Sequence, residues 1–131
     1  MTHISQRPTP QQIKEELRQF TGTENYYRYT LLPSFVYTDG IKYMAEICGA
    51  FWLIDTILSY QPSKIIRTEQ RLQSFQFWRL KVNQEEHSAV LSCEDGDGTV
   101  VLTQEIDFTD FPLTEFTCYL IDRVLLLSYE Y

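Results

Sequence analysis

The chain has 131 residues and a formal net charge of −7, with 44% hydrophobic and 22% charged residues. This length suits one domain with an ordinary core, and this composition excludes a disordered chain. We therefore expect a single domain over residues 1–131, in which residues 1–8 form a loose N-terminal tail. The charge is uneven, because residues 1–81 carry a net +3 and residues 82–131 carry −10, which disfavours general phosphate binding by the second part.

The three cysteines, Cys48, Cys93 and Cys118, are too few and too scattered for a disulfide framework. No apolar run reaches the roughly 20 residues that cross a bilayer, and the polar N-terminal segment is unlike a signal peptide. The sequence therefore predicts a cytoplasmic protein with no membrane partner and with reduced, buried cysteines.

A short amphipathic helix is expected to start near residue 9. Thr9 is a suitable N-cap, Pro10 fits the first helical position, and Gln12 completes a capping box. Ile13, Leu17 and Phe20 then follow on one face, and Gly22 is the residue expected to end the helix.

The central prediction is one long helix over residues 39–60. Its apolar residues surround the helix instead of forming one stripe, which indicates burial on nearly all sides. Gly49 inside it costs up to about 1 kcal/mol relative to alanine, and a close approach by a neighbouring element would explain that cost. The surplus apolar surface requires the first helix, a loop or a second subunit to cover it.

Segments of alternating polarity predict strands on both sides of this helix, and Asp95–Gly98 is a strong hairpin turn signal. The expected strands cover residues 25–32, 35–37, 75–82, 87–93, 99–108 and one or two pieces of 116–131, broken near Asp122 and Arg123. The predicted fold is α+β, an antiparallel sheet of about four to six strands packed against the long helix.

No motif of catalysis, metal binding or cofactor binding passes a geometric test. His87 and Cys93 would lie roughly 20 Å apart on one strand. A calcium loop that starts at Asp95 would need acids where Thr99 and Ile106 stand, and the glycines form no phosphate loop. We therefore assign no catalytic residue, no metal ligand and no cofactor.

Two groups of residues are kept as candidate binding residues. Glu46 and Asp55 are carboxylates on a mostly apolar helix, so each requires solvent or a partner, or lies in a cleft with a raised pKa. Phe75 and Phe77 share a strand face with two cations, Arg79 and Lys81, a pattern found where single-stranded nucleic acid binds. The ordinary alternative for this second group is a strand face with cations at its solvent end.

Four runs of sequence, Tyr37–Gly40, Gly49–Asp55, Thr109–Leu113 and Ser128–Tyr131, resemble a family of small bacterial proteins known only as a domain of unknown function. The resemblance extends over nearly the whole chain and implies a bacterial protein of cyanobacterial or mobile-element origin. It transfers no activity and no functional residue.

The leading interpretation is a non-enzymatic interaction protein that forms a homodimer, because the long helix has surplus apolar surface. A second interpretation is a mobile-element accessory protein that contacts nucleic acid, or mimics it through the acidic residues 82–131. A third is a small enzyme with a cleft of carboxylates and tyrosines.

Overall fold

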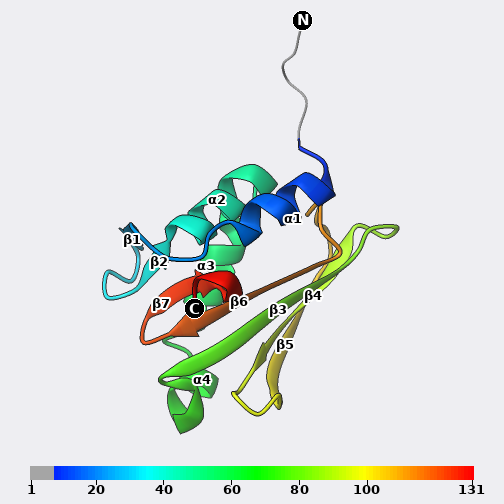
Figure 1. Ribbon diagram of the computed structural model, residues 1–131. Helices are drawn as coiled ribbons and strands as arrows, with labels where there is room; N and C mark the ends of the chain where they lie inside the picture. The colour runs from blue at the N-terminus through cyan, green and yellow to red at the C-terminus, as the bar shows by residue number, and fades with distance from the viewer. Residues whose placement is uncertain (1–7) are drawn as a thin grey trace, which may run out of the picture.

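The computed structural model describes residues 8–131, which form one seven-stranded sheet and four α-helices (Figure 1). The strand order is β1-β2-β7-β6-β3-β4-β5, and all neighbours are antiparallel except β2 and β7, which are parallel. The strands are β1 (Tyr26–Arg28), β2 (Val36–Thr38), β3 (Phe75–Asn83), β4 (Ser88–Glu94), β5 (Val100–Ile106), β6 (Glu115–Ile121) and β7 (Val124–Leu127). The α-helices are α1 (Pro10–Arg18), α2 (Asp39–Cys48), α3 (Phe51–Ser59) and α4 (Lys64–Thr68), and the 3-10 turns are η1 (Gln70–Leu72) and η2 (Ser128–Glu130).

The predicted α+β class is confirmed, but the sheet is larger than the expected four to six strands and is not wholly antiparallel. The expected tail, residues 1–8, lies outside the described residues except for Pro8. Within residues 8–131 no helix combines the length and the hydropathy needed to cross a bilayer.

Helix α1 begins as its sequence predicts and ends earlier. Thr9 Oγ1 accepts a hydrogen bond from the Gln12 backbone N–H at 3.1 Å, and Gln12 Oε1 accepts one from the Thr9 N–H at 2.8 Å. Ile13 and Leu17 are buried. The helix ends at a right-handed cap, Gln19, so the role predicted for Gly22 is wrong.

The long helix predicted over residues 39–60 is wrong, because the chain breaks it into α2 and α3. Gly49 takes a left-handed conformation with φ of +62°, and the Ala50 N–H donates to the Ala45 carbonyl at 2.8 Å. No atom lies within 4 Å of a Cβ built on Gly49. The glycine is therefore required by the backbone angle and not by a close neighbour.

Helix α1 covers the helical flank that the sheet leaves open. Ile13 and Leu17 belong to the same buried cluster as Ile41 and Met44 of α2. The rings of Phe20 and Tyr43 also meet there, with centroids 5.4 Å apart. Figure 1 shows α1, α2 and α3 together on one side of the sheet. The surplus apolar surface that suggested a second subunit is thus mostly buried within the chain.

The sheet has one buried face and one half-exposed face. Along β3, Gln76, Trp78 and Leu80 are buried while the alternate residues are not, and β6 shows the same alternation. The turn predicted at Asp95–Gly98 joins β4 to β5, and the break near Asp122 joins β6 to β7, as expected.

The strand predicted over residues 25–32 is much shorter. β1 contains only Tyr26–Arg28, and the chain after it turns back, because the Phe35 N–H donates to the Leu32 carbonyl at 2.9 Å. Leu31 lies in this turn and is 78% exposed, so it is not part of a strand face.

Candidate functional site

A row of aromatic rings crosses the half-exposed face of the sheet. Phe75 and Phe77 of β3 each lie 5.4 Å from the ring of Tyr119 on β6, and Tyr131 meets Tyr119 edge-on at 5.6 Å. The register places Phe77 opposite Tyr119 and Phe75 opposite Ile121. We call Phe75, Phe77, Tyr119 and Tyr131 the aromatic row. Tilted and edge-on packing holds the rings against one another while it leaves part of each surface open.

A charged cluster continues the aromatic row along β3. Arg79 Nε lies 3.1 Å from Glu94 Oε2 on β4, and Arg79 Nη1 lies 2.7 Å from Glu115 Oε2 on β6. The guanidinium also lies 5.0 Å from the centre of the Phe77 ring. Lys81 is exposed and opposes Glu115 in the register. Two cations and two carboxylates therefore share this end of the face.

The structure brings the four β3 candidates together on one face, as the alternation predicted. The hydrogen bond from Arg79 to Glu94, together with both carboxylate charges, raises the pKa of the Arg79 guanidinium despite its partial desolvation. Its charge is matched twice by protein carboxylates, so it offers little to a phosphate.

The two carboxylate candidates do not meet. Glu46 is exposed on α2, 4.0 Å from Lys42 Nζ. Asp55 on α3 accepts a hydrogen bond of 2.7 Å from the Tyr29 hydroxyl. Desolvation, with that hydrogen bond and the charge of Asp55, raises the pKa of Tyr29 to about 12. Each carboxylate thus has its own partner, and no shared point for acid–base chemistry lies between them.

Sequence reasoning missed Tyr119, Tyr131, Glu94 and Glu115. The sequence of β6 already shows alternating side chains, which place Glu115, Thr117 and Tyr119 on one face of the strand. What the sequence lacked was the pairing of β3 with β4 and β6, which brings these residues beside Phe77 and Arg79.

A buried carboxylate joins two of the four runs that carry the family resemblance. Glu130 Oε1 accepts hydrogen bonds from Thr38 Oγ1 at 2.6 Å and from the Leu127 N–H at 2.9 Å. Its Oε2 accepts from the Gly40 N–H at 3.2 Å, at the start of α2. A Cβ on Gly40 would lie 2.5 Å from Leu127 Cδ1 and 2.7 Å from Glu130 Oε1, so a larger residue would displace these side chains. These contacts explain the two runs structurally.

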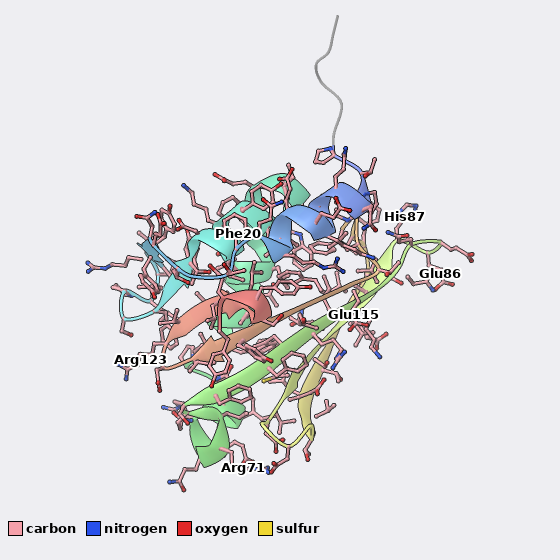
Figure 2. All side chains as sticks on the ribbon, in the orientation of Figure 1. Phe20, Arg71, Glu86, His87, Glu115 and Arg123 are labelled. Carbon is pink, nitrogen blue, oxygen red and sulfur yellow. The ribbon has the colours of Figure 1, made fainter. Side chains whose placement is uncertain are left out.

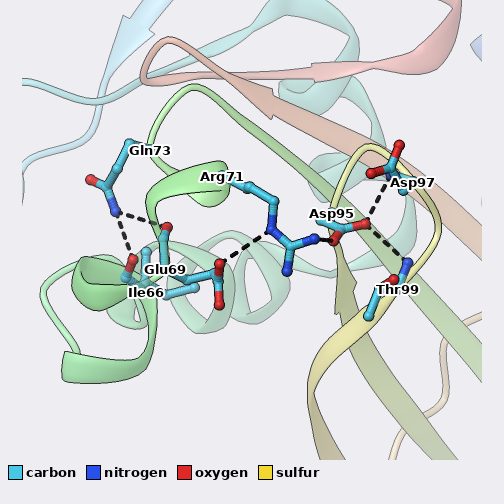
Figure 3. A network of polar contacts seen from close by, with 7 residues as sticks. All are labelled: Ile66, Glu69, Arg71, Gln73, Asp95, Asp97 and Thr99. Atoms are coloured by element: carbon cyan, nitrogen blue, oxygen red, sulfur yellow. Dashed lines mark hydrogen bonds and ion pairs between the residues drawn. The ribbon is translucent and has the colours of Figure 1, made fainter.

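An ion pair ties η1 to the β4–β5 turn (Figure 3). Asp95 Oδ1 accepts from the backbone N–H groups of Asp97 at 2.9 Å and Thr99 at 3.0 Å. Its buried Oδ2 has no aligned hydrogen-bond donor but lies 2.6 Å from Arg71 Nη1, and this short ion pair compensates for the burial. The network holds the turn in place and leaves no free ligand group.

Within residues 8–131 no group of three or more His, Cys, Asp or Glu side chains gathers as a metal site. No curated protein and no solved structure gives a significant match to the chain. Residues 11–131 match the family of unknown function DUF6876, and the chain belongs to this family.

Proposed function

We propose that this protein is a non-enzymatic interaction protein whose half-exposed sheet face binds a second copy of the chain. The aromatic row carries the proposal, because it places three partly exposed rings side by side on β3 and β6, with Tyr131 packed edge-on against Tyr119. Aromatic residues and arginine are the residue types that dominate binding energy at protein interfaces. Arg79, which is fixed by Glu94 and Glu115, adds such an anchor.

The charge pattern supports a second copy as the partner. A two-fold interface apposes the same patch on both subunits, so a patch with both signs of charge is complementary to itself. Lys81 is exposed beside Glu115, and Glu105 is exposed on β5, one strand beyond β4. A half-turn of one copy can thus bring Lys81 of one subunit to a carboxylate of the other.

The same charge pattern disfavours single-stranded nucleic acid as the ligand. Stacking rings are present, but the adjacent Glu94 and Glu115 repel phosphates and already neutralise Arg79. Mimicry of a phosphate backbone by residues 82–131 has less support than the charge total implies. Asp95 and Glu130 of that part are buried in internal networks.

Sedimentation velocity at micromolar concentrations tests the proposal. Wild-type protein is expected to sediment as a dimer, and Tyr131→Glu and Phe77→Glu are expected to weaken the dimer by roughly tenfold or more, since each buries an unpaired charge in the interface. Tyr131 is 80% exposed, so its substitution leaves the fold intact.

Phe108→Glu is the matched control, because Phe108 is 73% exposed and lies beyond the end of β5, outside the aromatic row. A wild-type monomer at about 100 µM would exclude an interface of useful affinity. Equal weakening by Phe108→Glu would move the interface away from this face.

A further inference from the structure

A polar cavity of about 310 Å³ lies at the end of the sheet where β6 turns into β7. Its walls come from the β1–β2 loop, the segment between α3 and η1, and the sheet itself, and include Ser34, Phe35, Gln61, Gln73, Gln76 and Arg123. This volume is at the lower limit of small-molecule sites. Figure 2 shows Arg123 at the β6–β7 turn, at the far end of β6 from Glu115, so the cavity is separate from the charged cluster on the open face.

The amides in the floor of this cavity have a fixed orientation. Trp78 Nε1–H can only donate, and it donates to Gln76 Oε1 at 2.8 Å. Gln76 Nε2 then donates to Gln61 Oε1 at 2.8 Å and to the Leu72 carbonyl at 2.9 Å. Gln61 Nε2 donates to Gln76 Oε1 at 3.1 Å and to the Ile57 carbonyl at 2.9 Å. All four N–H bonds of the pair are used internally.

The side-chain amides of Gln61 and Gln73 therefore offer a ligand carbonyl oxygens in place of N–H groups. Gln61 Oε1 accepts one hydrogen bond and has a second lone pair. Gln73 Nε2 donates to the Ile66 carbonyl at 2.6 Å, and Figure 3 shows its oxygen without a contact among the residues drawn. A ligand in this cavity must supply hydrogen-bond donors at this end.

Arg123, the cation at the cavity, has a backbone conformation that is unfavourable for arginine. Asp122 and Arg123 form the two-residue turn between β6 and β7, with φ of +49° and +70°. Such turns favour asparagine and glycine at these positions, and arginine at positive φ is strained. None of the ion pairs within residues 8–131 involves Arg123. Arg123 is exposed at the cavity, so its guanidinium, which is unpaired within the described residues, is accessible to an anionic ligand there.

We propose that this cavity binds a small acid that also carries a hydrogen-bond donor, which is the chemistry of a free amino acid or a hydroxy acid. Its carboxylate pairs with the Arg123 guanidinium, and its ammonium or hydroxyl group donates to the side-chain oxygens of Gln61 and Gln73. Phe35 and Leu72 provide apolar wall for a short side chain. The site is independent of the proposed dimer interface, and either can fail without the other.

Isothermal titration tests the proposal with each common L-amino acid, with L-lactate and glycolate, and with inorganic phosphate as a simple anion. At least one acid is expected to bind with a Kd of about 1 mM or tighter. Its N-acetyl derivative and its carboxamide are each expected to bind roughly tenfold more weakly, because each removes one of the two recognised groups. Amino acids and hydroxy acids in parallel distinguish an ammonium from a hydroxyl donor.

Two variants of Arg123 separate binding from folding. Arg123→Gln and Arg123→Gly are both expected to abolish measurable binding, while Arg123→Gly raises the melting temperature because glycine accepts the left-handed conformation. Arg18→Gln, an exposed arginine of α1 away from the cavity, is expected to bind as wild type does. The proposal is overturned if no acid binds, if phosphate binds in place of the acids, or if Arg123→Gly binds normally.

Discussion

The three cysteines show how burial controls the chemistry of single residues. Desolvation raises the pKa of the Cys48 and Cys93 thiols to about 12, and it raises that of Cys118 as well. The thiolate is the nucleophilic form of cysteine, so neutral, buried thiols are inert. The expectation from sequence that these cysteines are structural agrees with their positions in the core.

A thiol assay measures this directly. At pH 8, Ellman's reagent is expected to react with none of the three cysteines in the native protein over the time in which a free thiol reacts fully. All three are expected to react once guanidinium unfolds the chain, which is the internal control. Rapid reaction of one native thiol would show that its part of the core opens readily.

The residues of the open face show what a single sequence does and does not specify. Side chains alternate between the two faces of a strand, and this alternation was enough to place Phe75, Phe77 and Arg79 on one side. It carried no information on which strands flank β3. The neutralisation of Arg79 by Glu94 and Glu115 depends on that pairing, so the sequence overstated the similarity to a nucleic-acid surface.

Among the helices, the main error concerned a glycine. On a single straight helix, the apolar residues of 39–60 would lie on all sides. Helices α2 and α3 instead each bury one apolar stripe. The two stripes together give the same sequence pattern as one helix that is buried all round. A glycine that ends a helix has the same local sequence as one that interrupts it. Gly49 needed its left-handed backbone angle to be recognised, whereas Gly22 carried the expected signal without that role.

Substitution of Gly49 measures the free-energy cost of placing another residue at the break between α2 and α3. Gly49→Ala is expected to lower the free energy of unfolding by about 1–2 kcal/mol, because a Cβ disfavours the left-handed conformation. Gly49→Asn is expected to cost less, since asparagine tolerates that region. Urea denaturation followed by circular dichroism gives the values.

Gly22→Ala is the matched control, because Gly22 also has open space around it but no left-handed backbone angle. It is expected to change the free energy of unfolding by less than about 0.5 kcal/mol. A stabilising Gly49→Ala would mean that α2 and α3 are continuous in solution.

At the scale of the whole molecule, residues distant in sequence are joined by carboxylates. Asp39 at the start of α2 accepts hydrogen bonds from the Tyr27 hydroxyl at 2.9 Å and the Asn25 N–H at 3.0 Å. Asp95 joins η1 to the β4–β5 turn through Arg71. The net charge of −7 therefore does not show that some of the acidic side chains bind groups within the fold. Only the tertiary structure separates these acids from the solvated ones.

These carboxylates predict the response of the whole fold to acid. Desolvation raises the pKa of Asp39, but the hydrogen bonds from Tyr27 and Asn25 outweigh it and hold the pKa below its usual value. For Asp95, the Thr99 and Asp97 N–H groups and Arg71 lower the pKa against desolvation. A folded-state pKa below the unfolded one stabilises the protein above about pH 4, and this contribution is lost as the pH falls through the folded value.

The free energy of unfolding is therefore expected to fall steeply below about pH 4 in wild-type protein. Asp39→Asn and Asp95→Asn are expected to be less stable at pH 7 and to lose less on acidification, because the titrating group is gone. Asp107→Asn is the control, since Asp107 is exposed and makes no hydrogen bond or ion pair within residues 8–131. Urea titrations from pH 2 to pH 7 measure the three curves against wild type. If the Asp39→Asn and Asp95→Asn curves ran parallel to that of wild type, other carboxylates would govern the acid response, and the two contacts would contribute packing without charge.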